Sequence, residues 1–94
     1  MTYDEVIAAI RERYPLSLNR NYISLAMCGE VGELANKVKK AWGGYEAVPL
    51  DEIKLELADV ANYVHHMMLN LGMSEEELRD LRMKKAIRFL EKLG

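Results

Sequence analysis

Hydrophobic side chains recur at intervals of three and four residues along most of the chain, with polar side chains between them. This is the spacing of an amphipathic helix. The pattern breaks at Tyr14-Pro15, at Gly43-Gly44 and at Gly72, since proline cannot continue a helix and glycine commonly ends one. No segment shows the alternation of a β-strand. The pattern therefore predicts an all-α fold of four helices, with residues 1–94 forming one small domain of the four-helix-bundle type.

Capping signals mark where the predicted helices begin. Thr2 and Ser74 each precede a glutamate by three residues, which is the arrangement of a capping box at the start of the first and fourth helices. The second helix follows the polar stretch 17–21 and runs to about Trp42. The third begins near Pro49, because proline is favoured at a helix start.

Two pairs of acidic residues stand inside the second and third predicted helices, at Glu30/Glu33 and at Glu56/Asp59. A spacing of three places both acids of a pair on one side of a helix. Each pair lies at the edge of the apolar stripe of its helix, at a similar angle in both helices. The stripes consist of Met27, Val31, Leu34 and Val38 in the second helix and of Ile53, Leu57, Val60, Val64 and Met67 in the third. Two antiparallel helices packed through these stripes would bring the four acids to a shared groove at the edge of the core.

Four carboxylates in one groove repel one another unless a cation neutralises them. Oxygen ligands without cysteine favour Mg²⁺ or Mn²⁺. A di-iron oxidase is disfavoured because neither His65 nor His66 follows an acid by three residues. The alternative is that the acids are solvated and paired along one helix, as Glu33 could be with Lys37. Small residues that permit close approach of the two helices flank the acids: Gly29, Gly32, Ala35 and Ala58.

Three aromatic or imidazole side chains follow the second acidic pair. Tyr63 and His66 lie nearer its acidic flank, and either could line a pocket, although a position on the helix surface is the expectation for His66. His65 lies opposite Glu56 and is predicted to be a surface or subunit-contact residue.

Composition bounds the remaining possibilities. Half of the residues are hydrophobic, yet a chain of 94 residues buries a limited fraction of its surface, so we expect a homo-oligomer. The net charge of −2 offers no basic surface for a nucleic-acid polymer, whereas local cations could bind a free nucleotide. The lone Cys28 is expected to pack in the core and fits a reducing cytoplasm. We expect neither a signal peptide nor a membrane-spanning segment.

The last predicted helix carries cations beyond its acidic first turn. They are candidates for contacts to phosphate groups, or they stay solvated and complement the helix macrodipole. These residues are Arg79, Arg82, Lys84, Lys85, Arg88 and Lys92.

Three segments, Arg20-Asn21, Cys28–Ala35 and Glu56–Tyr63, together resemble the MazG-like all-α nucleoside triphosphate pyrophosphohydrolases, whose signature is Glu-x-x-Glu, a spacer, then Glu-x-x-Asp. The resemblance covers residues 17–90. It implies that the protein binds Mg²⁺ and cleaves a nucleoside triphosphate to the monophosphate and pyrophosphate, with nucleotide-pool house-cleaning as its broad role. It also implies a dimer or tetramer with active sites at or near subunit interfaces. The metal ligands that it implies are Glu30, Glu33, Glu56 and Asp59.

Under this hypothesis any of the four acids could be the general base, and Glu33 is our candidate. A relative specialised for dUTP is the competing enzyme. A non-catalytic helical module for oligomerisation or regulation is the competing hypothesis of another class. Base and sugar preference stay open. The candidate substrate-binding residues are Arg20, Asn21, Lys37, Trp42, Tyr63, Arg82, Lys85 and Arg88.

Overall fold

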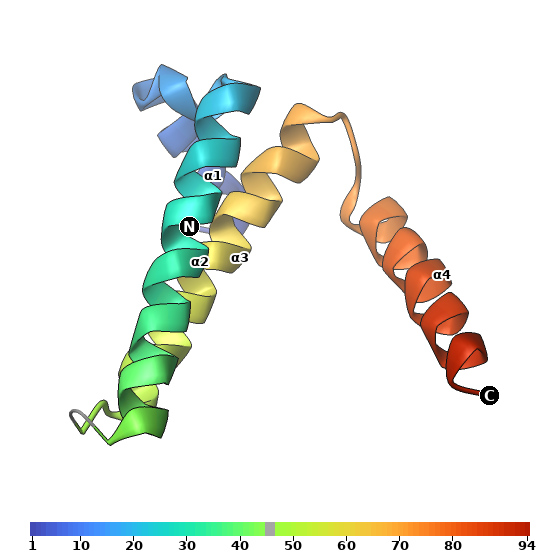
Figure 1. Ribbon diagram of the computed structural model, residues 1–94. Coiled ribbons are helices and arrows are strands. Elements are labelled where there is room, and N and C mark those ends of the chain that lie inside the picture. Colours follow the sequence, from blue (N-terminus) through green and yellow to red (C-terminus); the bar gives the residue numbers. More distant parts are fainter. Residues whose placement is uncertain (45–46) are drawn as a thin grey trace.

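The computed structural model describes residues 1–44 and 47–94, and over these residues it is built from helices alone (Figure 1). The all-α prediction is therefore confirmed for the described part of the chain. None of the described helices combines the length and apolarity needed to cross a bilayer. The elements are α1 (Tyr3–Arg13), the short 3₁₀ helix η1 (Pro15–Leu18), α2 (Arg20–Gly43), α3 (Leu50–Asn70) and α4 (Glu75–Leu93).

The predicted helix boundaries are reproduced by local interactions. At the start of α1, the Thr2 side chain accepts a hydrogen bond from the Glu5 amide, and the Glu5 side chain reaches back to the Thr2 amide. Ser74 caps α4 by accepting from the Glu77 amide at 3.1 Å. Gly44 caps the end of α2, and its φ of 72° is a left-handed conformation that glycine adopts without the cost of a Cβ clash.

The helices α2 and α3 lie side by side and antiparallel, and they form the longest contact in the molecule (Figure 1). Helix α1 and η1 pack across the end of this hairpin where α2 begins and α3 ends. The buried hydrophobic residues of the described chain are Ile7 of α1, Ile23 of α2 and Met68 of α3, and of these Ile23 is completely buried. The core of the single chain is therefore small and draws one residue from each of these helices.

Helix α4 projects away from the hairpin instead of packing along it (Figure 1). Its first turn is held to α3 by Glu75, whose carboxylate lies 3.6 Å from the His65 ring, and none of its residues is fully buried. The single chain is therefore a three-helix unit with a projecting fourth helix, and not a closed bundle of four.

The extended shape leaves an unusually large surface in water. A compact monomer of 10.8 kDa would expose about 5,500 Å², whereas this chain exposes 7435 Å². Its radius of gyration is 16.1 Å, compared with about 12 Å for a compact domain of this length. Exposed hydrophobic side chains include Leu25, Val31, Val38, Trp42, Leu57, Val64, Leu81, Phe89 and Leu90.

The two long helices are rotated relative to the packing that their apolar stripes predicted. Val31 and Val38 of α2 remain 46% and 45% exposed, and Leu57 of α3 remains 57% exposed. The side chain of Glu56, in contrast, is only 13% exposed. The acids thus face the gap between α2 and α3, while part of each stripe faces outward. The prediction that Cys28 packs in the core is wrong for the same reason: Cys28 is exposed, because α3 covers only one side of α2.

Candidate metal centre

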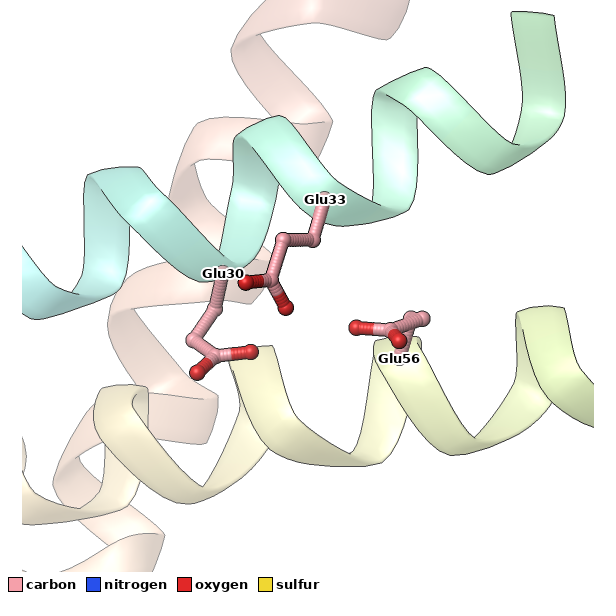
Figure 2. A group of neighbouring side chains, drawn as sticks. All are labelled: Glu30, Glu33 and Glu56. Carbon is pink, nitrogen blue, oxygen red and sulfur yellow. The ribbon is translucent and has the colours of Figure 1, made fainter. Parts of the chain in front are cut away.

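Three glutamates converge in the gap between α2 and α3. Glu30 and Glu33 come from successive turns of α2, and Glu56 reaches toward them from α3 (Figure 2). One carboxylate oxygen from each lies within 4.8 Å of the other two. The spacing of three along α2 and the antiparallel pairing of the helices together produce this arrangement.

Two oxygens of the cluster are buried without a partner. Neither Oε2 of Glu30 nor Oε2 of Glu56 has a hydrogen-bond donor among the described residues. Burial raises the pKa of Glu30 above its ordinary value, and the negative charges of Glu33, Asp59 and Glu56 raise it further. Buried acceptors normally have partners, so these oxygens are suited to a cation that supplies the missing positive charge.

One cation of the chain already contributes to the cluster. The Nζ of Lys37 lies 2.8 Å from Oε1 of Glu56, and this ion pair joins α2 to α3. The pairing differs from the predicted contact of Lys37 with Glu33 along one helix. The hydrogen bond with Glu56 raises the pKa of Lys37, against the opposing effect of burial. The ammonium of Lys37 by itself cannot neutralise the three carboxylates of this group.

Asp59, the fourth predicted ligand, is exposed and stands at the edge of the cluster. It does not belong to the three-glutamate group, although its charge acts on Glu30. Asp59 and Glu30 both line a cavity of 270 Å³ that opens beside the cluster. The other residues that line it come from α1, η1, α2 and α3: Ile10, Tyr14, Ser17, Tyr22, Asn62, Tyr63 and His66.

The small residues near the acids do not have the predicted packing role. A Cβ added to Gly29 or Gly32 would meet no atom within 4 Å. Both positions are open to solvent, because this side of α2 is not covered by α3. Close approach of the two helices therefore does not depend on these glycines.

The predicted substrate-binding residues near the start and end of α2 lie apart from one another. Arg20 donates from Nε to Oδ1 of Asn70 at 2.7 Å, which ties the start of α2 to the end of α3. Asn21 is exposed on the first turn of α2. Trp42 is 88% exposed near the end of that helix, beside an apolar groove that Val38 also lines. Tyr63, by contrast, lies at the cavity beside the cluster.

The predicted substrate-binding cations Arg82, Lys85 and Arg88 are exposed on α4, which projects away from the cluster (Figure 1). The structure therefore does not bring them to the acids of their own chain. Arg82 instead lines a groove between the first turns of α4 and the residues around Val64 of α3.

The expectation of a surface position for His66 is wrong. His66 is 7% exposed, and its Nδ1 atom is buried without a hydrogen-bond partner in the part of the chain that the structure describes. The sequence contains one signal for this placement, because His66 follows Asp59 by seven residues, or two helical turns, and so lies on the same side of α3. His65 has a 12% exposed side chain beside Tyr3, with ring centroids 5.0 Å apart.

Comparison with known proteins adds nothing to this geometry. No family model, curated protein or solved structure matches the chain. The resemblance to the MazG-like family thus rests on the motifs described above. The geometry itself provides three clustered carboxylates, a neighbouring lysine and an adjacent cavity.

Proposed function

We propose that this protein is a Mg²⁺-dependent nucleoside triphosphate pyrophosphohydrolase, which converts a (d)NTP to the (d)NMP and pyrophosphate. The observation that carries the proposal is the convergence of Glu30, Glu33 and Glu56, whose oxygens lie within 4.8 Å of one another across two helices. The motifs shared with the MazG-like family support the choice of substrate. House-cleaning of the nucleotide pool, in the cytoplasm, is the corresponding role.

The donor set fits Mg²⁺, with Mn²⁺ as a substitute. The ligand atoms are carboxylate oxygens, and two of the buried ones have no other partner among the described residues. Glu30, Glu33, Glu56 and Asp59 would hold the ion. When bound, it would polarise the phosphate chain and neutralise the charge that develops during phosphoryl transfer.

The residues of the chain would divide the remaining tasks. In the reaction, the oxygen of a water molecule bonds to phosphorus and the bridging bond between the α- and β-phosphates breaks, with pyrophosphate leaving. A carboxylate takes the proton of the attacking water. Glu33 is our candidate for this base, because its side chain is exposed to solvent beside the other two. Lys37 keeps Glu56 oriented and adds positive charge near the phosphates.

A homo-oligomer is the second part of the proposal. The chain exposes about 1,900 Å² more than a compact monomer of its mass. Association of two chains that removed this excess would bury a total of about 3,800 Å², within the range of obligate homodimers. The outward apolar side chains Val31, Val38 and Trp42 would then be covered. A dimer or tetramer also gives α4 a packing partner that its own chain does not provide.

The exposed apolar surface also favours a second candidate function, that of a non-catalytic helical oligomerisation module. In that case Lys37, among the described residues, and solvent would neutralise the acids. The two candidates differ in the requirement for the acids, so one experiment separates them.

The test measures pyrophosphate release from a panel of NTPs and dNTPs, dUTP included, with Mg²⁺ and with the metal chelated. We expect wild-type activity that requires metal and falls at least a hundredfold in Glu33→Gln and Asp59→Asn. Matched controls are Glu91→Gln and Asp80→Asn, which make the same chemical changes on α4. Hydrolysis of none of the nucleotides, or equal activity in all four variants, would support the module instead.

A further inference from the structure

A charged contact holds the first turn of α4 to the rest of the protein. Nδ1 of His65, near the end of α3, lies 3.6 Å from Oε1 of Glu75, the first residue of α4. From position 79 to the end of the chain every residue is exposed, and Figure 1 shows this part of α4 standing clear of the other helices. The direction of α4 is therefore decided at its first turn, where Glu75 meets His65.

Two cavities flank this contact, so the junction between α3 and α4 is loosely packed. One of 380 Å³ is bordered by α1, α3 and the start of α4, and the other, of 260 Å³, by α3 and α4. His65, Met68 and Glu75 line both of them. Close packing fixes the angle between neighbouring elements, because a change of angle would disrupt many contacts at once. A junction with open space on both sides lacks that constraint, so a single polar contact can decide the angle.

The connector between the two helices can accommodate a change of direction. Residues 71–74 join α3 to α4, and Gly72 has a φ of 71°, a conformation that glycine adopts without a Cβ clash. The amide of Met73 donates to the carbonyl of Met68 at 3.0 Å, which anchors the connector to the end of α3. A few residues at the end of an element are sufficient to absorb a hinge motion. The helix beyond Ser74 can thus turn while α3 stays in place.

His65 itself is fixed by contacts with α1. The rings of Tyr3 and His65 meet edge to face, with their centroids 5.0 Å apart. The Tyr3 hydroxyl donates to Oδ1 of Asn62, one turn earlier on α3, at 2.7 Å. The imidazole has a 12% exposed side chain, whereas the side chain of Glu75 is 67% exposed. Glu75 is therefore the partner that can leave the contact for solvent.

The charge of His65 decides how strongly the two side chains attract each other. Histidine ordinarily changes charge between about pH 5 and pH 8, whereas aspartate, glutamate and arginine keep theirs. A charged imidazole attracts the Glu75 carboxylate, and a neutral one forms no ion pair with it. The other charged residues that line the two cavities come from α1 and α4: Asp4, Arg11, Arg79 and Arg82. Their charges form a constant background to the titration of His65.

Two further titratable groups lie at the junction. Burial raises the pKa of Tyr3, and the charges of Glu75 and Asp4 raise it further, so its hydroxyl keeps its proton. Burial lowers the pKa of His66, the next residue of α3, and nearby cationic groups lower it further. Neither group changes charge near pH 7, so a response of the junction in that range comes from His65.

We propose that the junction of α3 and α4 is a pH-sensitive hinge, in which the charged imidazole of His65 holds Glu75 and keeps α4 in its projecting direction, whereas the neutral imidazole releases it. The inference goes beyond the proposed function, because it involves neither nucleotide nor metal. The direction of α4 also determines where its exposed apolar side chains, which include Phe89 and Leu90, are presented to other molecules.

The distance between two spin labels tests the hinge. Cys28 is free and exposed on α2 and carries one label, and Lys92→Cys, near the end of α4, carries the other. Labelled protein is diluted into an excess of unlabelled protein, so that only distances within one chain contribute. Pulsed electron paramagnetic resonance then gives the distance distribution at about pH 5.5 and at about pH 8. The same measurement is made in His65→Gln, in Glu75→Gln and in the matched control Glu76→Gln, which changes the next acid of the same turn.

We expect a narrow distribution at the lower pH that broadens at the higher pH, as the projecting direction loses about two- to fivefold in population relative to other directions. The Glu76→Gln control keeps this response, whereas His65→Gln and Glu75→Gln give the broad distribution at both pH values. A distribution that does not change with pH in the labelled protein overturns the inference. A response that persists in His65→Gln does so too. Should His65→Gln not fold, Glu75→Gln decides alone, because its side chain is largely exposed.

Discussion

Metal binding is expected to reverse the effect of Glu33→Gln on stability. Without metal, the substitution removes one of the carboxylates that lie within 4.8 Å of one another, so the variant is expected to be at least as stable as wild type. With metal, the same substitution removes a ligand. The ranking of the two proteins should therefore change sign when Mg²⁺ or Mn²⁺ is added.

The magnitude follows from linkage between binding and folding. Metal at a hundred times its dissociation constant stabilises the wild type by about 2.7 kcal/mol. For a domain of this length, that corresponds to a rise in Tm of about 10–20 °C. If loss of one ligand weakens binding about a hundredfold, the same metal concentration stabilises Glu33→Gln by only about 0.4 kcal/mol, or about 3 °C.

Thermal unfolding monitored by circular dichroism, with and without metal, measures both quantities. Glu91→Gln is the matched control, because this glutamate lies on α4, away from the cluster, and should keep the full metal-induced shift. A wild type that folds but shows no shift with either ion would refute the reasoning. So would a full shift in Glu33→Gln.

Three further results are expected. The pKa of Glu30 is raised above 4.5 in the folded state, so protonated Glu30 favours folding below pH 4.5, and this contribution to stability is lost as pH rises through the raised pKa. Urea unfolding measured across this pH range should show a smaller loss of stability in Glu30→Gln than in wild type. Equal dependence of stability on pH in the two proteins would contradict the assignment. Trp42 is 88% exposed in the single chain and lines the apolar groove that Val38 also lines. If this groove is an interface between copies, Trp42→Ala should weaken self-association by about 2 kcal/mol or more. Sedimentation velocity would detect this change, with Leu25→Ala, which lies outside the groove, as the control. An effect of Trp42→Ala within about 0.5 kcal/mol would indicate that Trp42 is an ordinary surface position. Ile23→Ala should cost about 2–5 kcal/mol in chemical unfolding because Ile23 is completely buried, and a cost below about 1 kcal/mol would show that the core is built differently.

The starts of α1, α3 and α4 and the end of α2 were predictable from the sequence because local interactions decide them, whereas the short helix η1 was not predicted. The Thr2 capping box and the end of α2 at Gly43-Gly44 depend on residues within one turn, and both are present as predicted. The two acidic pairs were also recognisable, since a spacing of three fixes their side of the helix regardless of what packs against it. The all-α class follows from the same local rules.

Which side of each long helix faces its neighbour was decided only by the tertiary structure. The apolar stripes predicted that Val31 and Leu57 would meet between the helices, yet both are exposed, and the acids occupy the gap. A stripe records every apolar contact that a helix makes, including contacts with other copies, so it cannot assign each residue to one partner. The outward orientation of α4 was likewise decided only by the tertiary structure.

The sequence by itself therefore determined the helices, their caps and the acids that could hold a metal. The tertiary structure decided that Glu56 joins Glu30 and Glu33, that Lys37 pairs across the helices, and that His66 is buried at a cavity. The physical reason is the range of the interactions. Hydrogen bonds within one turn depend on neighbouring residues. The meeting of α2 with α3, in contrast, joins side chains such as Lys37 and Glu56, which are nineteen positions apart, and depends on how whole helices pack.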